Sequence, residues 1–168
     1  MAFPLLLLGA SAILVLASNK HSKQGSSRLL AKNGQKWVKP QNGAIVSCGI
    51  FGVFEHSGIW LDGNIIELKG NGLIRGISPK RFLQNRSGKQ IYVACDNNDR
   101  PVTDNTVAMR ASEKLFHYCE YDLIRNNCHK FVWSCVSGKS TALTGFSELN
   151  SLLAEHYDCE IHWQKAEI

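Results

Sequence analysis

The segment from residue 43 to residue 68 constrains the fold most, because two strand-like runs in it are joined by the tight turn Asp62-Gly63. Both runs are rich in β-branched and aromatic residues and are bounded by glycines, which is typical of β-strands. An Asp-Gly pair between such runs favours a two-residue hairpin turn. That turn fixes three cross-strand pairs: Leu61 with Asn64, Trp60 with Ile65, and Gly58 with Glu67. We therefore predict an antiparallel meander in this segment.

The rest of the chain predicts helices and a further strand. Apolar side chains recur at helical intervals over residues 104–119, with Thr103 or Asp104 as the N-cap. Another helix is expected to begin at Cys128 and to stop at Ser137-Gly138. A short helical turn is expected from Ser78-Pro79, a further strand at Gln90–Cys95 and an amphipathic stretch at Phe146–Tyr157, followed by a C-terminal strand or loose segment. Together these patterns predict an α+β fold, with an antiparallel sheet packed on helices.

The N-terminal residues predict a membrane anchor. Residues 2–18 are apolar or small and carry no charge. As a helix they would rise roughly 25 Å, close to the thickness of a bilayer core. A cleaved signal peptide is the alternative, but no basic residue precedes the run and Val15-Leu16-Ala17 is a poor cleavage site. We therefore expect an N-terminal transmembrane helix over residues 1–19.

Basic residues are concentrated directly after the apolar run, in a predicted linker over residues 20–36. Six of the 19 Lys and Arg residues precede residue 40, which leaves 13 against 14 Asp and Glu in residues 40–168. By the positive-inside rule, this distribution predicts a single-pass membrane protein whose domain faces the cytoplasm. The near-neutral domain argues against nucleic-acid binding. The linker either contacts anionic lipid headgroups or only fixes the topology.

The cysteines are expected to be free thiols. There are six of them, and none forms a C-x-x-C pair. A domain in the cytoplasm is in a reducing compartment, where disulfides are rare. The Cys and His residues that lie close together in the sequence lack the spacing of zinc ligands. We therefore expect no metal and no cofactor.

Cys128 is a candidate nucleophile because of its predicted place at the start of a helix. Unpaired backbone N–H groups and the helix dipole stabilise a thiolate there, which lowers the pKa of a thiol from its free value of about 8.5. The same N–H groups, with Asn127 as the helix cap, would hold the oxyanion of an acyl-transfer reaction. A buried structural cysteine is the alternative.

His56 and Glu67 supply the second half of a candidate site. Side chains alternate along strands, so the predicted hairpin register places His56, Gly58 and Glu67 on one face, with Glu67 diagonal to His56. A carboxylate there would fix the tautomer of the imidazole and favour its charged form. The residues thus indicate a triad in which Cys128 is the nucleophile, His56 the general base and Glu67 the group that orients His56. A solvated His/Glu surface pair is the alternative.

The segments EHSGIWLDGNIIEL and NNCHKFV resemble the lecithin:retinol acyltransferase family, which includes the small HRAS-like suppressor phospholipase/acyltransferases. His56 matches the base of that family, and Asn127-Cys128 with Phe131 matches its nucleophile motif. The resemblance implies a circularly permuted papain-like fold, related to the NlpC-type peptidases. It implies a catalytic domain at residues 37–140, followed by a C-terminal amphipathic extension at residues 141–168.

The function that the resemblance implies is that of a membrane-anchored thiol acyltransferase or phospholipase, acting on lipid acyl esters through a thioester on Cys128. The chain departs from the family pattern in three places. The hairpin turn is one residue shorter, Glu67 stands where these acyltransferases have a second His, and His129 replaces a common Glu. Two alternatives therefore stay open: a papain-like amidase or peptidase acting on cell-wall or isopeptide bonds, and a non-catalytic membrane-tethered binding module.

Overall fold

The computed structural model describes residues 36–50, 54–122 and 126–168. These residues form one seven-stranded sheet and four helices, so the predicted α+β class is confirmed for them. The strands are β1 (Trp37–Val38), β2 (Ile45–Ile50), β3 (Phe54–Leu61), β4 (Asn64–Leu68), β5 (Ile74–Ile77), β6 (Tyr92–Cys95) and β7 (His162–Ala166). The helices are α2 (Pro79–Leu83), α3 (Asn105–Glu113), α4 (Cys128–Ser137) and α5 (Phe146–Tyr157).

The sheet is mixed, with the strand order β1-β7-β6-β2-β3-β4-β5. Every neighbouring pair is antiparallel except β1 and β7, which run parallel. The prediction of a wholly antiparallel sheet is therefore wrong at this edge. Strand β1 has only two residues, and the amide of Lys165 in β7 donates to the carbonyl of Lys36 at 2.9 Å. The two strands come from opposite ends of the domain, so no local pattern in the sequence could predict that they pair.

The central hairpin has the register that the Asp-Gly turn predicts. Trp60 pairs with Ile65 and Leu61 with Asn64. Asp62 and Gly63 both have positive φ, at 47° and 76°, as a two-residue type I′ turn requires. The next pairs in this register bring Glu67 toward the half of β3 that contains His56.

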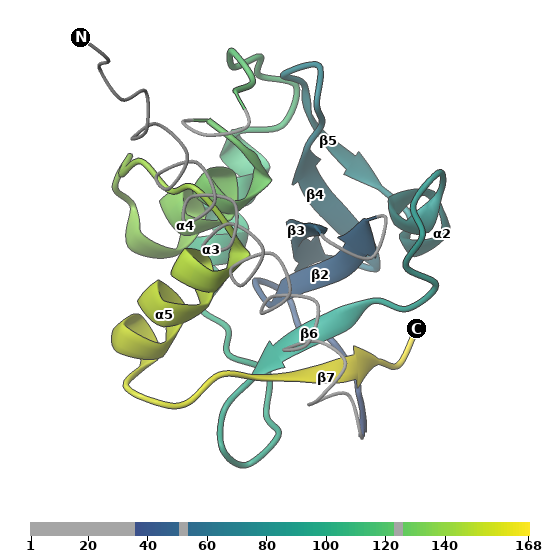
Figure 1. Cartoon of the computed structure of the whole chain (residues 1–168), viewed down its shortest axis with the longest axis vertical. Helices are drawn as coiled ribbons and strands as arrows, with labels where there is room; N and C mark the ends of the chain where they lie inside the picture. Colours follow the sequence, from purple (N-terminus) through teal and green to yellow (C-terminus); the bar gives the residue numbers. More distant parts are fainter. Residues whose placement is uncertain (1–35, 51–53, 123–125) are drawn as a thin grey trace, which may run out of the picture.

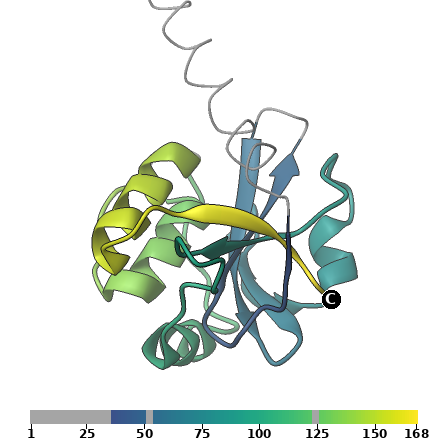
Figure 2. The same cartoon turned by 90° about the horizontal axis from the view of Figure 1, so that it is seen from below.

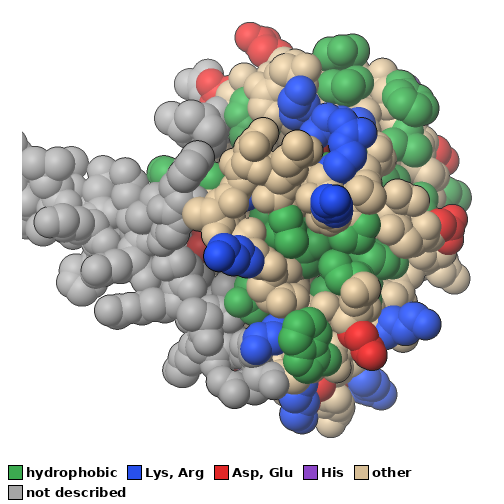
Figure 3. Space-filling view, turned by 90° about the vertical axis from the view of Figure 1, so that its right-hand side faces the viewer, with side chains coloured by type: hydrophobic (Ala, Val, Ile, Leu, Met, Phe, Trp, Pro, Cys, Tyr) green, Lys and Arg blue, Asp and Glu red, His purple; other side chains and the backbone are tan. Residues whose placement is uncertain are grey.

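The helices cover both faces of the sheet (Figures 1 and 2): α3, α4 and α5 lie on one face and α2 on the other. Because neighbouring residues of a strand point to opposite faces, β3 places Ile59 in the core beneath α3–α5 and Trp60 in the core beneath α2. Figure 3 looks onto the side that bears α2, where Lys and Arg side chains are spread between hydrophobic ones.

The C-terminal residues share this sheet and core. The predicted amphipathic stretch is α5, which buries Phe146, Leu149 and Leu153. The chain then continues into β7, where Trp163 is fully buried and its Nε1 donates to Asn150 Oδ1 at 2.9 Å. The predicted extension at residues 141–168 thus contributes one helix and one strand to the fold.

Two elements differ from the sequence prediction. The helix predicted over residues 104–119 is capped by Asp104 but ends at Glu113. It ends early because Phe116 has a φ of 65° and donates its N–H to the carbonyl of Ile74, which turns the chain alongside β5. Strand β5 itself was not predicted, since glycines interrupt the hydrophobic pattern on both sides of Ile74.

The predicted transmembrane helix at residues 1–19 lies outside the described residues, as does the basic linker up to residue 35. Among the residues from 36 onward that the structure describes, no helix combines the length and the hydropathy needed to cross a membrane. The anchor therefore stays a prediction.

We predict that Gly58→Ala destabilises the fold by about 1–3 kcal/mol, as overpacking of a core does. A Cβ at this position would lie 2.6 Å from Ile65 Cγ2 and 2.8 Å from the carbonyl oxygen of Ile66, and the backbone atom cannot move aside. Urea unfolding measures the change. Gly70→Ala is the matched control, because a Cβ there meets no atom within 4 Å. Equal stability of the two variants would contradict the prediction.

Candidate active site

Cys128 is the first residue of α4 and is buried, with 4% of its surface exposed. Asn127 caps the helix: its Oδ1 accepts the backbone N–H groups of His129 and Lys130, both at 3.0 Å. The helix ends at Gly138, whose φ of 70° is the left-handed conformation that favours glycine at this position. The predicted helix start, N-cap and stop are thus confirmed.

Phe131 and Val132 anchor α4 in the core beneath the sheet. Because this face of the helix is fixed, the position of its first residue is fixed with it. The start of α4 lies against β3, the strand that carries His56.

The Glu67 carboxylate is fully buried and accepts hydrogen bonds from three side chains. His56 Nε2 lies 2.7 Å from Glu67 Oε2, as the predicted register requires. Arg75, from β5, donates through Nε and Nη2 to Oε1 at 2.9 and 2.7 Å. Arg86, from the loop after α2, donates to Oε2 at 2.9 Å. A buried carboxylate needs such compensation, and here both oxygens have two donors.

Two imidazoles, those of His56 and His129, lower the pKa of the Cys128 thiol. Because His56 Nε2 is held by Glu67, Nδ1 is the ring nitrogen left to face the thiol. On the other side, His129 Nδ1 lies 2.9 Å from the buried hydroxyl of Ser57. The structure therefore brings Cys128, His56 and Glu67 together, and it adds His129 and Ser57.

The start of α4 is linked to two consecutive residues of β3: His129 contacts Ser57, and Cys128 and His56 affect each other's pKa. His56 and Ser57 point to opposite faces of β3. In the described residues, β3 pairs with β2 from Phe54 to Ile59, whereas its recorded pairing with β4 covers only Ile59–Leu61. The recorded pairing between β3 and β4 thus ends before the half of β3 that contains His56 and Ser57.

The electrostatics of the site favour a thiolate and an imidazolium. Burial raises the pKa of Cys128, but attraction to His129 and His56 and hydrogen bonds from both lower it well below its usual value. Burial lowers the pKa of His56, but the negative charge of Cys128 and hydrogen bonds to Cys128 and Glu67 raise it overall. Burial raises the pKa of Glu67, but its contacts with His56, Arg86 and Arg75 lower it to about 2.

The helix cap occupies two of the backbone N–H groups that were expected to bind the oxyanion. The N–H groups of His129 and Lys130 are occupied by Asn127 Oδ1, and Asn127 Nδ2 donates to the carbonyl of Leu143 at 2.9 Å. The N–H of Cys128 is the first of the helix and has no intrahelical acceptor. Of the N–H groups at the helix start to which the sequence assigned the oxyanion, with Asn127 as cap, this one is not bound by the Asn127 side chain in the recorded contacts.

Four contributors to the site were missed from the sequence: Arg75, Arg86, Ser57 and His129. Arg75 lies in the unpredicted strand β5, directly opposite Glu67. Arg86 lies in a loop, which carries no periodicity. Ser57 follows His56 in the sequence, so strand alternation places it on the opposite face of β3, away from the predicted triad. Only His129 carried a signal, because it stands where the family has a Glu.

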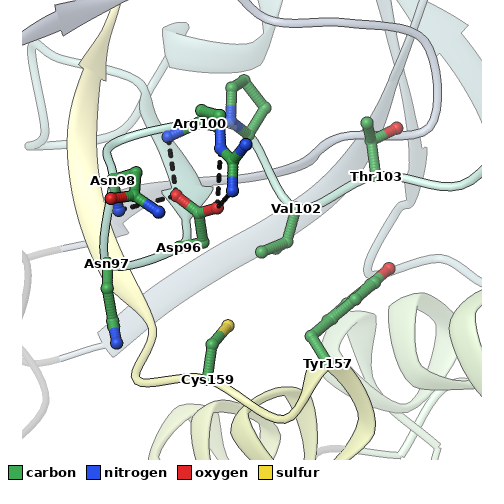
Figure 4. Close-up of a pocket in the computed structure, with 9 residues that line it drawn as sticks. Asp96, Asn97, Asn98, Arg100, Val102, Thr103, Tyr157 and Cys159 are labelled. Carbon is green, nitrogen blue, oxygen red and sulfur yellow. Dashed lines mark hydrogen bonds and ion pairs between the residues drawn. The ribbon is translucent and has the colours of Figure 1, made fainter.

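A cavity of about 390 Å³ lies elsewhere, between the loop after β6 and the end of α5. Figure 4 shows Asp96 and Arg100 of that loop facing Tyr157 and Cys159, and Asp96 is paired with Arg100. None of the predicted site residues lines this cavity. Within the described ranges, no group of three or more His, Cys, Asp or Glu side chains is placed to hold a metal ion.

Fold and site together define a class of protein. A thiol at the first turn of a helix meets an imidazole and a carboxylate on a sheet in an α+β domain, the arrangement of papain-like cysteine enzymes. Within this class, the family model described as Lecithin retinol acyltransferase matches residues 75–141 and supports placing the chain in that family. The matched stretch contains Cys128, whereas His56 and Glu67 precede it.

A comparison with curated proteins found no match. The family match points to acyltransferase or thiol-hydrolase chemistry, with a cysteine as nucleophile. The matched residues do not include His56 and Glu67, so the placement of these two residues in the site depends on the structure.

We predict that Cys128 is alkylated by iodoacetamide before the other thiols at about pH 6, where an ordinary thiol is protonated. Burial raises the pKa of Cys48 and Cys95 to about 12 and that of Cys135 to about 11. The pKa of Cys159 is also raised, by burial and nearby carboxylates, although its side chain is more exposed than that of Cys128. Peptide mass spectrometry measures labelling at each cysteine. Faster labelling of Cys159 would show that exposure and not thiolate content governs reactivity.

We predict that Glu67 makes stability depend on pH below about 4.5. Its pKa is lowered from 4.5 to about 2 in the folded chain, so its contribution is present above the unfolded value and is lost as the pH falls toward 2. The contribution is on the order of 3 kcal/mol at neutral pH. Urea unfolding at a series of pH values should show this loss in the wild type and a flatter dependence in Glu67→Gln. The exposed residue Glu155 provides the control variant, Glu155→Gln, which should keep the wild-type slope.

Proposed function

We propose that the protein is a thiol acyltransferase or phospholipase that acts on lipid acyl esters. One observation carries the proposal: the buried Cys128 thiol at the start of α4 interacts with the His56 imidazole, which Glu67 holds at 2.7 Å. A cysteine with a lowered pKa and a paired imidazole is suited to attack a carbonyl carbon. The family match supports acyl transfer as the reaction class.

The proposed reaction has two halves. Cys128 gives its proton to His56 Nδ1, and the thiolate attacks the ester carbonyl to form a tetrahedral intermediate whose oxyanion faces the Cys128 N–H. Collapse releases the alcohol, which takes the proton back from His56, and leaves the acyl group as a thioester on Cys128. An acceptor hydroxyl, amine or water then attacks the thioester, with His56 taking its proton and returning it to the sulfur.

Glu67 has the orienting role in this scheme. Its carboxylate accepts a hydrogen bond from His56 Nε2–H, so that the imidazole presents Nδ1 to the sulfur. Arg75 and Arg86 hold the carboxylate from the other sides, at 2.7 and 2.9 Å. A carboxylate can therefore fill the position at which the sequence departs from the second His of the family.

The membrane is the proposed source of substrate. The apolar run at residues 2–18 and the basic residues after it support a single-pass anchor, with the domain facing the cytoplasm and the linker near anionic headgroups. Lys and Arg side chains are also spread over the surface that bears α2 (Figure 3). An anchored domain would meet lipid acyl esters without leaving the bilayer surface.

We predict that incubation with phospholipid micelles releases or transfers fatty acid and leaves an acyl group on Cys128. Cys128→Ala should lower the rate by at least about 10³-fold, because it removes the nucleophile. Thin-layer chromatography of the products and intact-protein mass spectrometry measure the two effects. Cys135→Ala, in the same helix but away from His56, should keep both. Cys128→Ala activity equal to the wild type, with no trapped acyl group, would overturn the proposal.

The same experiment separates an amide hydrolase from a lipid enzyme. Glu67 motivates this alternative, since it departs from the acyltransferase pattern. Cleavage of peptide or isopeptide substrates by Cys128, together with no action on phospholipid, would assign the chain to the amidases. A cysteine-accessibility assay that placed residues 40–168 outside the cytoplasm would favour a cell-wall substrate.

A further inference from the structure

Two aromatic side chains separated by one residue are exposed at one end of the sheet. Phe116 is 78% exposed and Tyr118 is 72% exposed. Both follow α3 and lie beside the turn between β4 and β5, where Tyr118 forms a bridge with Leu73 (Figure 1). Single hydrophobic side chains are common on protein surfaces, but large ones this close together indicate an interaction surface.

The backbone that carries these aromatics is fixed to the sheet. Phe116 donates its N–H to the carbonyl of Ile74, and Ile74 donates its N–H to the carbonyl of His117, both at 2.9 Å. Cys119 donates to the carbonyl of Gly72 at 2.9 Å, and a Cβ on Gly72 would collide with the Cys119 carbonyl. Phe116 has a φ of 65°, a left-handed conformation that bulky residues rarely adopt. Packing of the fold does not explain a strained backbone that holds a phenyl ring in solvent, and such outliers cluster at functional sites.

These aromatics lie at the end of the sheet that bears the candidate active site. Because β3 and β4 are antiparallel, the start of β3 and the turn after β4 are at the same end. The 2.9 Å contact between Ser57 and His129 brings the start of α4 to that end as well. Phe54, the first residue of β3, is 53% exposed and stands two residues before His56. Three of the six exposed large hydrophobic side chains in the described residues thus lie here, and we call them the aromatic surface: Phe54, Phe116 and Tyr118.

The charges close to the aromatic surface in the sequence balance one another. Lys69 begins the turn after β4 and Lys114 precedes Phe116, whereas Glu113 and Glu120 stand at the two ends of the segment after α3. A surface that binds anionic lipid carries a clear excess of Lys and Arg. Aromatic rings without such an excess are typical of side chains that sit at the level of the headgroups and upper acyl chains of a bilayer. The composition therefore favours a neutral phospholipid interface as the partner.

We propose that the aromatic surface docks the domain on the interface of a phospholipid bilayer, so that the end of the sheet with the candidate active site faces the lipid. This inference rests on the proposed function for the lipid substrate. The predicted anchor permits the orientation, because a linker the length of residues 20–36 spans up to roughly 60 Å when extended, more than the diameter of a compact domain of this size. The fixed backbone also means that little conformational freedom is lost on docking.

The first test measures how deeply one side chain enters the bilayer, with the full-length protein on phosphatidylcholine vesicles that contain a brominated lipid. The tryptophan introduced by Phe116→Trp should be quenched at least about threefold more than the one introduced by Ile168→Trp, because an interfacial side chain lies roughly 5–10 Å inside the headgroup boundary. Ile168 is the matched control, since it is 61% exposed and lies at the C-terminus, away from the aromatic surface (Figure 1). Each variant is read as a difference from the wild type, which has four tryptophans of its own. Equal quenching of the two variants would overturn the proposal.

The second test compares the rates on two physical forms of substrate. The double variant with Phe116→Ser and Tyr118→Ser should lower the rate on phospholipid vesicles, relative to the rate on a dissolved short-chain phospholipid, by about tenfold or more, since burial of one phenyl side chain is worth about that factor. Ile168→Ser should keep the wild-type ratio, and an unchanged ratio in the double variant would overturn the proposal. Strong quenching in Phe116→Trp without any acyl transfer would reject the proposed function alone. Acyl transfer with equal quenching in the two tryptophan variants would reject the docking surface alone.

Discussion

The Glu67 carboxylate is the interaction on which the arrangement of the site depends. Taking a carboxylate wholly out of water costs several kcal/mol unless its oxygens are paired. Its three partners come from separate parts of the fold: His56 from β3, Arg75 from β5, and Arg86 from the loop after α2. The carboxylate therefore links β3, β4 and β5 to that loop, and movement of any one of them would remove a donor from a buried charge.

The loop that carries Arg86 is itself fixed to the sheet by a close backbone contact. Gly88 donates its N–H to the carbonyl of Gly49 in β2 at 3.0 Å. A Cβ on Gly88 would lie 2.6 Å from that oxygen, so only glycine permits this approach. The guanidinium is thus held beside Glu67 by local packing as well as by its charge, and this contact explains why a loop residue forms part of a buried ion-pair network.

The sequence predicted local features well and distant ones poorly. The Asp62-Gly63 turn determined the register of β3 and β4, and the capping preference of Asn127 determined where α4 begins. Both depend on neighbouring residues. Arg75 and the parallel β1–β7 edge could not be predicted this way, because each depends on contacts between separate segments and β5 is broken up by glycines. The partners of Glu67 followed from the fold, whereas Glu67 itself followed from alternation along a strand.

The arginines also change what Glu67 does to His56. A lone buried carboxylate would favour the imidazolium so strongly that His56 would be slow to return its proton. Arg75 and Arg86 share the carboxylate charge, and the positive charge of Arg86 opposes protonation of His56. Glu67 can then orient the ring through Nε2 without holding its proton permanently. This balance gives a physical reason why a carboxylate is compatible with acid–base catalysis at this position.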